Sequence, residues 1–298
     1  MTTSRTAEYV ALYRALETTE SRREPLFRDP YAALFLTGSR ARWYSLASMP
    51  GMRGIIERYG DFRAPGARTS SIAGTRYIDD VVRDEVMVRG IRQIVILGAG
   101  YDSRAHRIPE LLKKGVAVFE VDTPELQAEK RARLKGLPNL HPVEYVPADL
   151  ERDHLPTLLA DAGWEADHRS IVIWEGVTSY LDEKAVGATL DMVSGTKAGS
   201  SLIFTYVHKG MLDGSVRFEG AAELMLRVSM LGEPWKFGLH PDQLASYLEP
   251  FRLGLEKDRG ADDYRAKYFQ RKDRGYGFYR IALARVLGRA TPQPGAKR

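Results

Sequence analysis

The stretch from Arg92 to Asp122 constrains the fold of this chain more than any other. It begins with a short apolar run rich in β-branched residues and continues through the turn Gly98-Ala99-Gly100 into a segment of helical character. It closes on a second apolar run that ends in acidic residues. Short apolar runs bounded by turn residues are typical of buried strands, and glycine tolerates the positive φ angles of a tight turn. This order predicts a nucleotide-type ligand site in a doubly wound α/β sheet.

The residues around the turn discriminate between two classes of nucleotide ligand. A dinucleotide fingerprint has a third glycine where this chain has Ser103, and a pyrophosphate disfavours a carboxylate such as Asp102 at the helix N-terminus. An acidic turn suits ammonium and sulfonium charges, which favours S-adenosylmethionine. Asp122, 24 residues after Gly98 at a predicted strand end, can accept both hydroxyls of a ribose. The alternative is that the glycines only form a tight turn.

Four motifs along the chain form a set: L-G-A-G-Y-D-S-R-A-H-R at 97–107, F-E-V-D-T-P at 119–124, A-D-L at 148–150 and W-E-G-V-T-S-Y-L at 174–181. The set resembles the successive motifs of the leucine carboxyl methyltransferase family, a bacterial-rich branch of the class I S-adenosylmethionine-dependent O-methyltransferases. The resemblance covers roughly residues 5–285, and the last motif makes it specific. It implies carboxyl methylation, with S-adenosyl-L-methionine as cofactor and S-adenosyl-L-homocysteine as product.

Beyond the glycine turn, apolar runs alternate with segments of helical period. This alternation predicts an α/β fold with a mostly parallel sheet covered on both faces. Strands are predicted at 94–97, 116–121, 143–147, 170–174 and 201–207, and helices near 103–114, 124–134, 155–162 and 183–195. Strand-like runs at 251–256 and 275–286 resemble the final two strands of a Rossmann-like class I methyltransferase sheet, in which the last strand is antiparallel.

The pattern divides the chain into three parts, the second of which contains an insertion. Residues 1–90 show helical periodicity and are predicted to form an N-terminal cap, while 91–288 form the methyltransferase domain and 289–298 a disordered tail. Within the domain, 209–241 carries too many large apolar residues for a connector, so we interpret it as a substrate-side insertion. The alternative is that these residues fill the core of a helical pair. They are Met211, Phe218, Met225, Met230, Trp235 and Phe237.

The ligand of an open parallel sheet lies beyond the carboxyl ends of the strands, so residues following the strands are the candidates for cofactor binding. The glycine turn would approach the methionine part of the cofactor and Asp122 its ribose. The resemblance implies that Asp149 and Leu150 flank the adenine. The candidate cofactor-binding residues are Arg68, Arg76, Gly98, Ala99, Gly100, Asp102, Asp122, Asp149, Leu150, Glu175 and Gly176.

Two of these assignments concern charge. Glu175 follows an apolar run and precedes glycine, which favours a role at the amino group or sulfonium of the cofactor over helix capping. The carboxylate of the cofactor needs a cation, and arginine binds carboxylates bidentately. Arg68 and Arg76 lie in a segment that resembles the family's arginine motif. The distance to Gly98 favours Arg76, but either side chain could be a surface arginine.

Three residues are candidates for catalysis. The resemblance places Tyr180 over the reacting methyl group, while Glu175 and His208 could accept a proton. A carboxylate acceptor needs no base, whereas a phenol or alcohol acceptor does. The sequence shows no dedicated base, which favours carboxylate methylation; hydroxyl methylation and a non-catalytic cofactor-binding regulator are the alternatives. The six histidines show no metal-ligand spacing, so no metal is predicted.

The composition and charge of the chain limit the kinds of partner and the cellular location that we expect. The formal net charge of +5 arises from 44 basic residues interspersed among 39 acidic ones, so we expect no nucleic-acid partner. A mildly positive field would favour an anionic, partly apolar small-molecule acceptor. The sequence contains neither a transmembrane-length apolar run nor a signal peptide, and it lacks cysteine. We therefore expect a cytoplasmic protein without membrane partners, whose oligomeric state is open.

Overall fold

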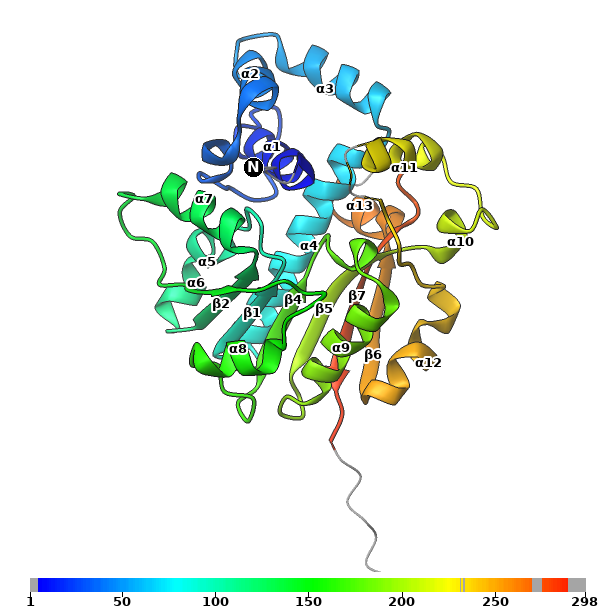
Figure 1. The fold of residues 1–298 in the computed structure, drawn as a ribbon. Helices are drawn as coiled ribbons and strands as arrows, with labels where there is room; N and C mark the ends of the chain where they lie inside the picture. Colours follow the sequence, from blue (N-terminus) through cyan, green and yellow to red (C-terminus); the bar gives the residue numbers. More distant parts are fainter. Residues whose placement is uncertain (1–4, 231, 233, 270–274, 289–298) are drawn as a thin grey trace, which may run out of the picture.

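The structure is a computed structural model, and it describes residues 5–230, 232, 234–269 and 275–288. These residues form a seven-stranded sheet with the strand order β3-β2-β1-β4-β5-β7-β6 (Figure 1). The strands are β1 (Gln93–Leu97), β2 (Ala117–Asp122), β3 (Glu144–Pro147), β4 (Ser170–Trp174), β5 (Ser201–Val207), β6 (Leu253–Gly260) and β7 (Tyr279–Val286). The first five strands pair in parallel, and β7 is antiparallel to both β5 and β6. The predicted fold class is confirmed.

The sheet reverses its direction of growth at β1. Gln93 of β1 pairs with Ala117 of β2 on one side and with Ser170 of β4 on the other. The chain moves outward from β1 to β3 and then crosses back to β4. A ligand crevice opens at such a switch point, outside the carboxyl ends of the strands. The glycine turn after β1 and Glu175 after β4 therefore lie at the same edge of the sheet, where this rule places a ligand.

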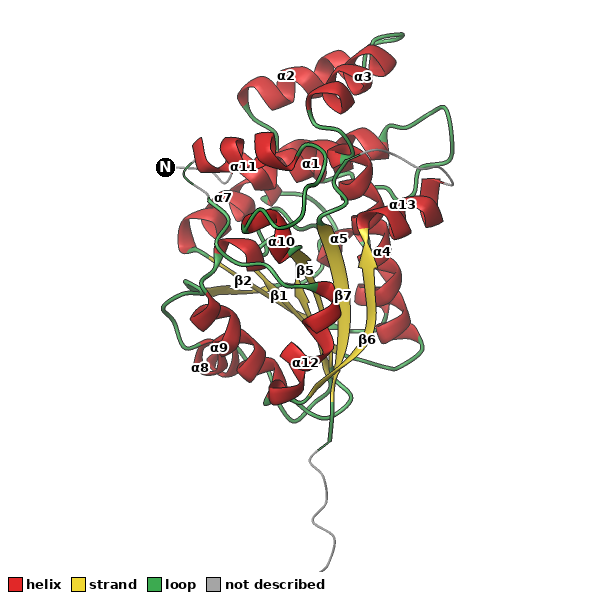
Figure 2. Ribbon diagram, turned by 90° about the vertical axis from the view of Figure 1, so that its right-hand side faces the viewer, coloured by secondary structure: helices red, strands yellow, loops and turns green. Residues whose placement is uncertain are grey.

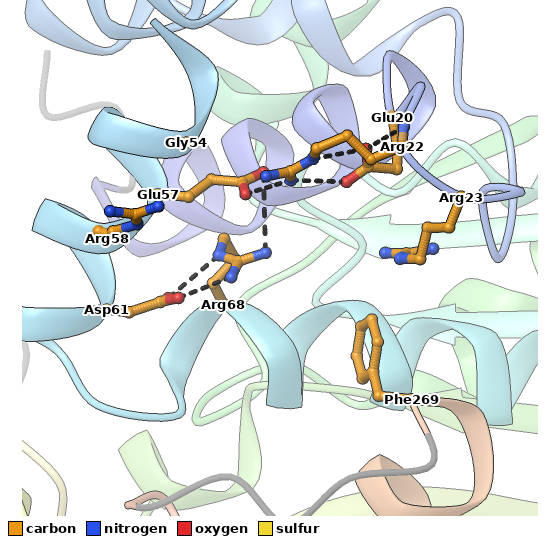
Figure 3. Close-up of a pocket in the computed structure, with 9 residues that line it drawn as sticks. All are labelled: Glu20, Arg22, Arg23, Gly54, Glu57, Arg58, Asp61, Arg68 and Phe269. Carbon is orange, nitrogen blue, oxygen red and sulfur yellow. Dashed lines mark hydrogen bonds and ion pairs between the residues drawn. The ribbon is translucent and has the colours of Figure 1, made fainter. Parts of the chain in front are cut away.

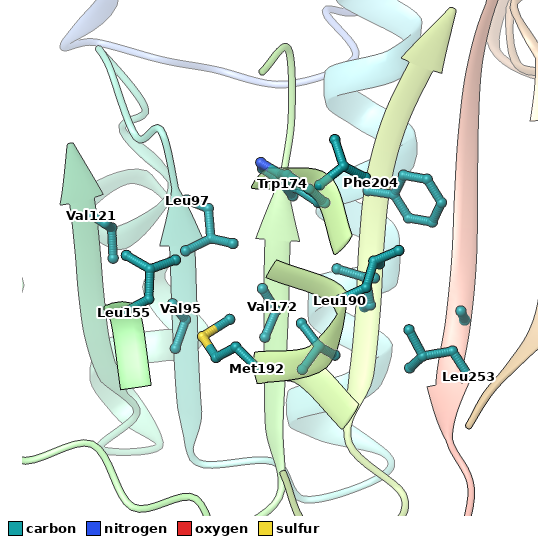
Figure 4. Close-up of a cluster of buried hydrophobic side chains, with 14 of the residues drawn as sticks. Val95, Leu97, Val121, Leu155, Val172, Trp174, Leu190, Met192, Phe204 and Leu253 are labelled. Atoms are coloured by element: carbon teal, nitrogen blue, oxygen red, sulfur yellow. The ribbon is translucent and has the colours of Figure 1, made fainter. Parts of the chain in front are cut away.

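Strand β1 has apolar residues on both faces because helices cover both sides of the sheet. Val95 and Leu97 pack with Leu190 and Trp174 against the helices in front, and Ile94 and Ile96 pack against those behind (Figures 1 and 4). The front layer contains α8 (Leu155–Asp161), α9 (Glu183–Ser194) and α12 (Leu244–Leu248), and the rear layer α4 (Ala67–Met87), α5 (Arg104–Arg107), α6 (Pro109–Lys113) and α13 (Ala261–Phe269). Continuous apolar runs are what a doubly covered parallel sheet requires.

The residues before β1 are helical where the structure describes them. Asp29 accepts hydrogen bonds from the N–H groups of Tyr31 and Ala32, both 3.1 Å long, and so starts the short helix η1. Figures 1 and 2 show α1, α2 and α3 gathered above the carboxyl edge of the sheet. The elements of this region, with the helix that packs beneath it, are α1 (Arg5–Thr18), η1 (Ala32–Phe35), α2 (Gly38–Ala47), α3 (Arg53–Arg63) and α7 (Pro124–Leu134).

The large apolar residues of segment 209–241 pack in two different places. Phe237 packs into the main core, whereas Met211, Phe218 and Trp235 form a separate cluster with Phe278 near the start of β7. The described elements of this region and the short helices beside it are α10 (Lys209–Leu212), α11 (Ala221–Met230), η2 (Thr178–Tyr180), η3 (Pro241–Gln243) and η4 (Glu249–Phe251). The predicted tail, 289–298, lies outside the described residues. None of the described helices is both long and apolar enough to cross a membrane.

Candidate functional site

The glycine turn and Asp122 form one hydrogen-bonded unit. Gly98 and Gly100 have φ angles of +61° and +48°, which side-chain-bearing residues rarely adopt. Asp122 accepts hydrogen bonds from the backbone N–H groups of Gly100 (2.6 Å) and Thr123 (2.7 Å). Burial raises the pKa of Asp122, and these two N–H groups counteract it. The carboxylate therefore lies directly beside the turn, at the end of β2.

Gly98 also has a close neighbour in the segment that follows β4. A Cβ added at Gly98 would lie 2.4 Å from Cγ2 of Val177, whose branched side chain cannot easily move. The φ of Gly115 is +60°, but a Cβ there meets nothing within 4 Å. We expect Gly115→Ala to cost about 1–2 kcal/mol for the left-handed conformation, and Gly98→Ala to cost a further 1–3 kcal/mol, roughly, for the overlap.

Chemical denaturation of the two variants measures this difference. Because the φ angles match, the comparison isolates the contact with Val177. Equal unfolding free energies for Gly98→Ala and Gly115→Ala would contradict the predicted overlap.

Arg104 is the central cation of the site, and the sequence analysis did not single it out. It is 3% exposed, and its guanidinium contacts Asp79 at 2.9 Å, Asp102 at 2.5 Å and Glu175 at 2.7 Å. Asp102 also accepts the backbone N–H of Arg104, the first residue of α5, at 2.7 Å. One arginine thus joins α4, the glycine turn and the end of β4. The sequence feature that could have pointed to Arg104 is its place in the D-S-R of the first motif, directly after Asp102 and Ser103.

This pairing accounts for the charge state of the buried acids. Burial alone would raise the pKa of Asp102, but Arg104 and other nearby cations hold it well below its usual range. The pKa of Asp79 is likewise lowered, since Arg107 and Arg104 outweigh its complete burial. Glu175 was predicted at the cofactor's amino group or sulfonium. Its side chain is 26% exposed, so it contacts Arg104 without being fully buried.

The second acid of β2 has a different environment. Glu120 is buried and lies 2.6 Å from the amino group of Lys130 on α7. Burial raises the pKa of Glu120 to about 6, although Lys130 opposes the shift. The two acids share one face of β2, because side chains alternate along a strand, but only Asp122 stands at the end of the strand and accepts the N–H of Gly100.

The two arginines proposed for the cofactor carboxylate contact other groups in this structure. Arg76 lies 2.8 Å from Asp80 and donates to the carbonyl of Leu26. Arg68 contacts Asp61 at 2.6 Å and lines a cavity of about 340 Å³ in the N-terminal region (Figure 3). Among the described residues, no hydrogen bond or ion pair joins either arginine to the glycine turn. Their assignment to the cofactor stays a prediction.

The remaining cofactor candidates follow β3 and β4. Asp149 is about half exposed; it accepts the backbone N–H of Glu151 at 2.9 Å, and Leu150 packs against the main core. Gly176 has a φ of +73° and donates its N–H to Oγ1 of Thr205 at 2.7 Å. Contact of Asp149 and Leu150 with an adenine is compatible with these positions and stays a prediction.

The catalytic candidates lie on different segments around the same edge. Tyr180 ends η2, and its hydroxyl lies 3.5 Å from Oγ1 of Thr6 on α1. His208 follows β5 and caps α10, with Nδ1 accepting the N–H of Gly210 at 3.0 Å. Burial and the neighbouring His240 lower the pKa of His208. Because Nδ1 accepts the backbone N–H of Gly210, the proton of the neutral His208 ring lies on Nε2.

Comparisons with known proteins agree with this geometry. Residues 7–194 match the model of the family described as leucine carboxyl methyltransferase. A Frankia alni protein, whose name places it among the S-adenosyl-L-methionine-dependent methyltransferases, is 35% identical over 273 residues, which are 86% of this chain and 91% of that protein. A Streptomyces coelicolor protein with the same description is 34% identical over 214 residues, 70% of each chain.

Solved structures support the fold. A Thermobifida fusca structure described as that of a methyltransferase has a TM-score of 0.60 at 17% identity and covers 94% of each chain. A DUF574 family protein of Streptomyces avermitilis has a TM-score of 0.58 at 13% identity, over 93% of this chain and 96% of the other. The family model and the sequence relatives identify the family as well as the fold. The chain therefore belongs to the leucine carboxyl methyltransferase family and is an S-adenosylmethionine-dependent methyltransferase.

Proposed function

We propose that this enzyme methylates a carboxylate of a small molecule and releases its methyl ester. The observation that carries the proposal is that both candidate bases are engaged in contacts of the fold. Glu175 contacts Arg104 at 2.7 Å, and the acceptor nitrogen of His208 receives the N–H of Gly210. A carboxylic acid with a pKa near 4 is ionised at neutral pH and needs neither group. A phenol or alcohol would need a free base.

The chain's residues fit the cofactor that this reaction requires. The positive φ angles of Gly98 and Gly100 leave the turn without side chains, and Asp122 lies beside it at the end of β2. We assign Asp122 to the ribose hydroxyls, and Asp102 and Glu175 to the positively charged methionine end. Bound there, the cofactor supplies an electrophilic methyl group whose C–S bond breaks, with its electron pair returning to sulfur, as a carboxylate oxygen forms the new C–O bond.

The N-terminal helices contribute a proposed cap over this reaction. A Cβ on Gly100 would lie 3.5 Å from the Cβ of Ala7, and Arg14 of α1 donates to the backbone carbonyl of Tyr101 at 2.5 Å. Helix α1 thus contacts the glycine turn directly. We assign residues 1–90 to alignment of the acceptor and exclusion of water, because well-oriented reactants can lower a barrier by roughly 7–11 kcal/mol.

The dependence of turnover on pH tests the proposal. For a carboxylate acceptor, kcat should stay flat from about pH 6 to 9, because the acceptor is fully ionised throughout this range. The measurement is methyl transfer from labelled S-adenosylmethionine to a panel of carboxylic acids, phenols and proteins. A steep rise of kcat through neutrality that is lost in Glu175→Gln or His208→Ala, with unchanged cofactor affinity, would favour hydroxyl methylation. Cofactor binding without any product would favour a regulator.

A further inference from the structure

Five aromatic side chains gather where β5 ends and β7 begins. Trp235 is the centre of this aromatic cluster: its ring centroid lies 6.4 Å from that of Tyr180, nearly perpendicular, and 6.1 Å from that of Phe278. Tyr276 completes the cluster, 4.9 Å from Phe278 and 6.0 Å from Tyr279. These residues come from η2, from the segment before η3, and from the first residue of β7 with the turn before it. Three separated segments thus place aromatic rings together.

A hydrogen-bonded chain joins this aromatic cluster to the proposed reaction centre. The Tyr279 hydroxyl donates to Oγ1 of Thr205 at 3.0 Å, and the same oxygen accepts the N–H of Gly176 at 2.7 Å. A Cβ on Gly176 would lie 3.9 Å from the Tyr279 hydroxyl. The cluster is therefore adjacent to Glu175 and Gly176, at the carboxyl end of β4.

Two features of the aromatic cluster are unfavourable for packing alone. The indole N–H of Trp235 is buried and has no hydrogen-bond partner among the described residues. Tyr276 has a φ of +62°, which is rare for a residue with a bulky side chain. A buried donor without a partner is costly, and backbone strain of this kind gathers at ligand sites. A bound oxygen atom at Trp235 would satisfy the indole.

The aromatic cluster also reaches the protein surface. Tyr276 lines a small depression between the turn after α3 and the start of α11, together with Arg63, Pro65 and Glu223. Arg63 is exposed, so a cation lies at the depression. The acids Glu219 and Glu223 line the same depression, so both signs of charge are present there.

We propose that the aromatic cluster is the acceptor subsite and that it takes planar aromatic carboxylic acids. Resting on the proposed carboxylate methylation, this inference adds the substrate class. The acceptor ring packs among Tyr180, Tyr276 and Phe278, since aromatic pairs favour edge-to-face and offset contacts. One acceptor oxygen receives the indole N–H of Trp235. The buried donor then selects against acceptors that present no oxygen there.

Calorimetry on the full chain saturated with S-adenosylhomocysteine tests this subsite. We expect 1-naphthoate to bind at least tenfold more tightly than hexanoate. Trp235→Phe keeps an aromatic ring but removes the donor, so it should raise the Kd of 1-naphthoate about five- to tenfold. Trp235→His, which restores a ring N–H, should recover part of this loss. The matched control is Trp43→Phe in α2, where Trp43 stacks on Tyr59 with centroids 5.4 Å apart; we expect less than a twofold change.

The outcomes separate the subsite from the proposed reaction. Equal Kd values for 1-naphthoate and hexanoate, or an unchanged 1-naphthoate Kd in folded Trp235→Phe, would overturn the subsite. Methylation of 2-naphthol instead of 1-naphthoate, reduced by Trp235→Phe, would overturn the carboxylate acceptor and retain the aromatic subsite. Circular dichroism establishes that each variant is folded.

Discussion

Replacing Arg104 with methionine is expected to lower the free energy of unfolding by about 3–5 kcal/mol, the range for removing one partner of a buried ion pair. Asp79 is fully buried and Asp102 nearly so, and both carboxylates contact Arg104. Methionine has a similar length but no charge, so Asp102 would lose its nearest cation and Asp79 would retain only Arg107. Urea denaturation with circular dichroism measures the loss.

An exposed ion pair provides the control for this substitution. Arg28 lies 4.0 Å from Glu24, and their side chains are 67% and 89% exposed. Such pairs contribute about 0–1 kcal/mol, so Arg28→Met should change the unfolding free energy little. Equal effects of Arg28→Met and Arg104→Met would show that the buried network does not stabilise the fold.

The same variant should change the response to acid. The folded-state pKa of Asp102 lies below its unfolded value, so its stabilising contribution is present above about pH 4 and is lost as the pH falls. Removing Arg104 brings the two pKa values closer together. We therefore expect the unfolding free energy of Arg104→Met to vary less between pH 5 and pH 3 than that of the unmodified protein.

Replacing Asp122 with alanine is expected to weaken S-adenosylhomocysteine binding about ten- to hundredfold. The carboxylate sits at the end of β2 and already holds the N–H of Gly100 at 2.6 Å. Loss of a hydrogen bond to a charged group costs about 1.5–3 kcal/mol, and the substitution also frees the glycine turn. Calorimetric titration measures the change in Kd. Asp122→Asn, which keeps one carbonyl oxygen, should have a smaller effect.

Two comparisons make this prediction specific. Glu125 is an exposed acid three residues later. Glu125→Ala removes the same charge without touching the ribose site, so it should leave the Kd for S-adenosylhomocysteine unchanged. NAD should not bind measurably, because Ser103 replaces the third glycine of a dinucleotide turn. Unaltered S-adenosylhomocysteine affinity in folded Asp122→Ala would remove Asp122 from the ribose site.

Local sequence patterns were sufficient to predict the sheet. The runs at 94–97, 170–174 and 201–207 are apolar because the middle strands are covered on both faces. These strands can therefore be recognised in the sequence without knowing which helices cover them. The turn at Gly98 and Gly100 was equally predictable, because the need for positive φ is a property of the local backbone. The motif set also identified the family.

The partners of the charged side chains were decided only by the tertiary structure. A sequence shows that Arg68, Arg76 and Arg104 are cations, but a long flexible side chain can reach several acids, and burial selects among them. Arg76 meets Asp80 one turn along its own helix, but only the fold brings it to the carbonyl of Leu26 and buries Arg104 between α4 and the ends of β1 and β4. The aromatic cluster has the same origin. Its rings come from three segments that are far apart in the chain, and these meet because β7 pairs antiparallel with β5.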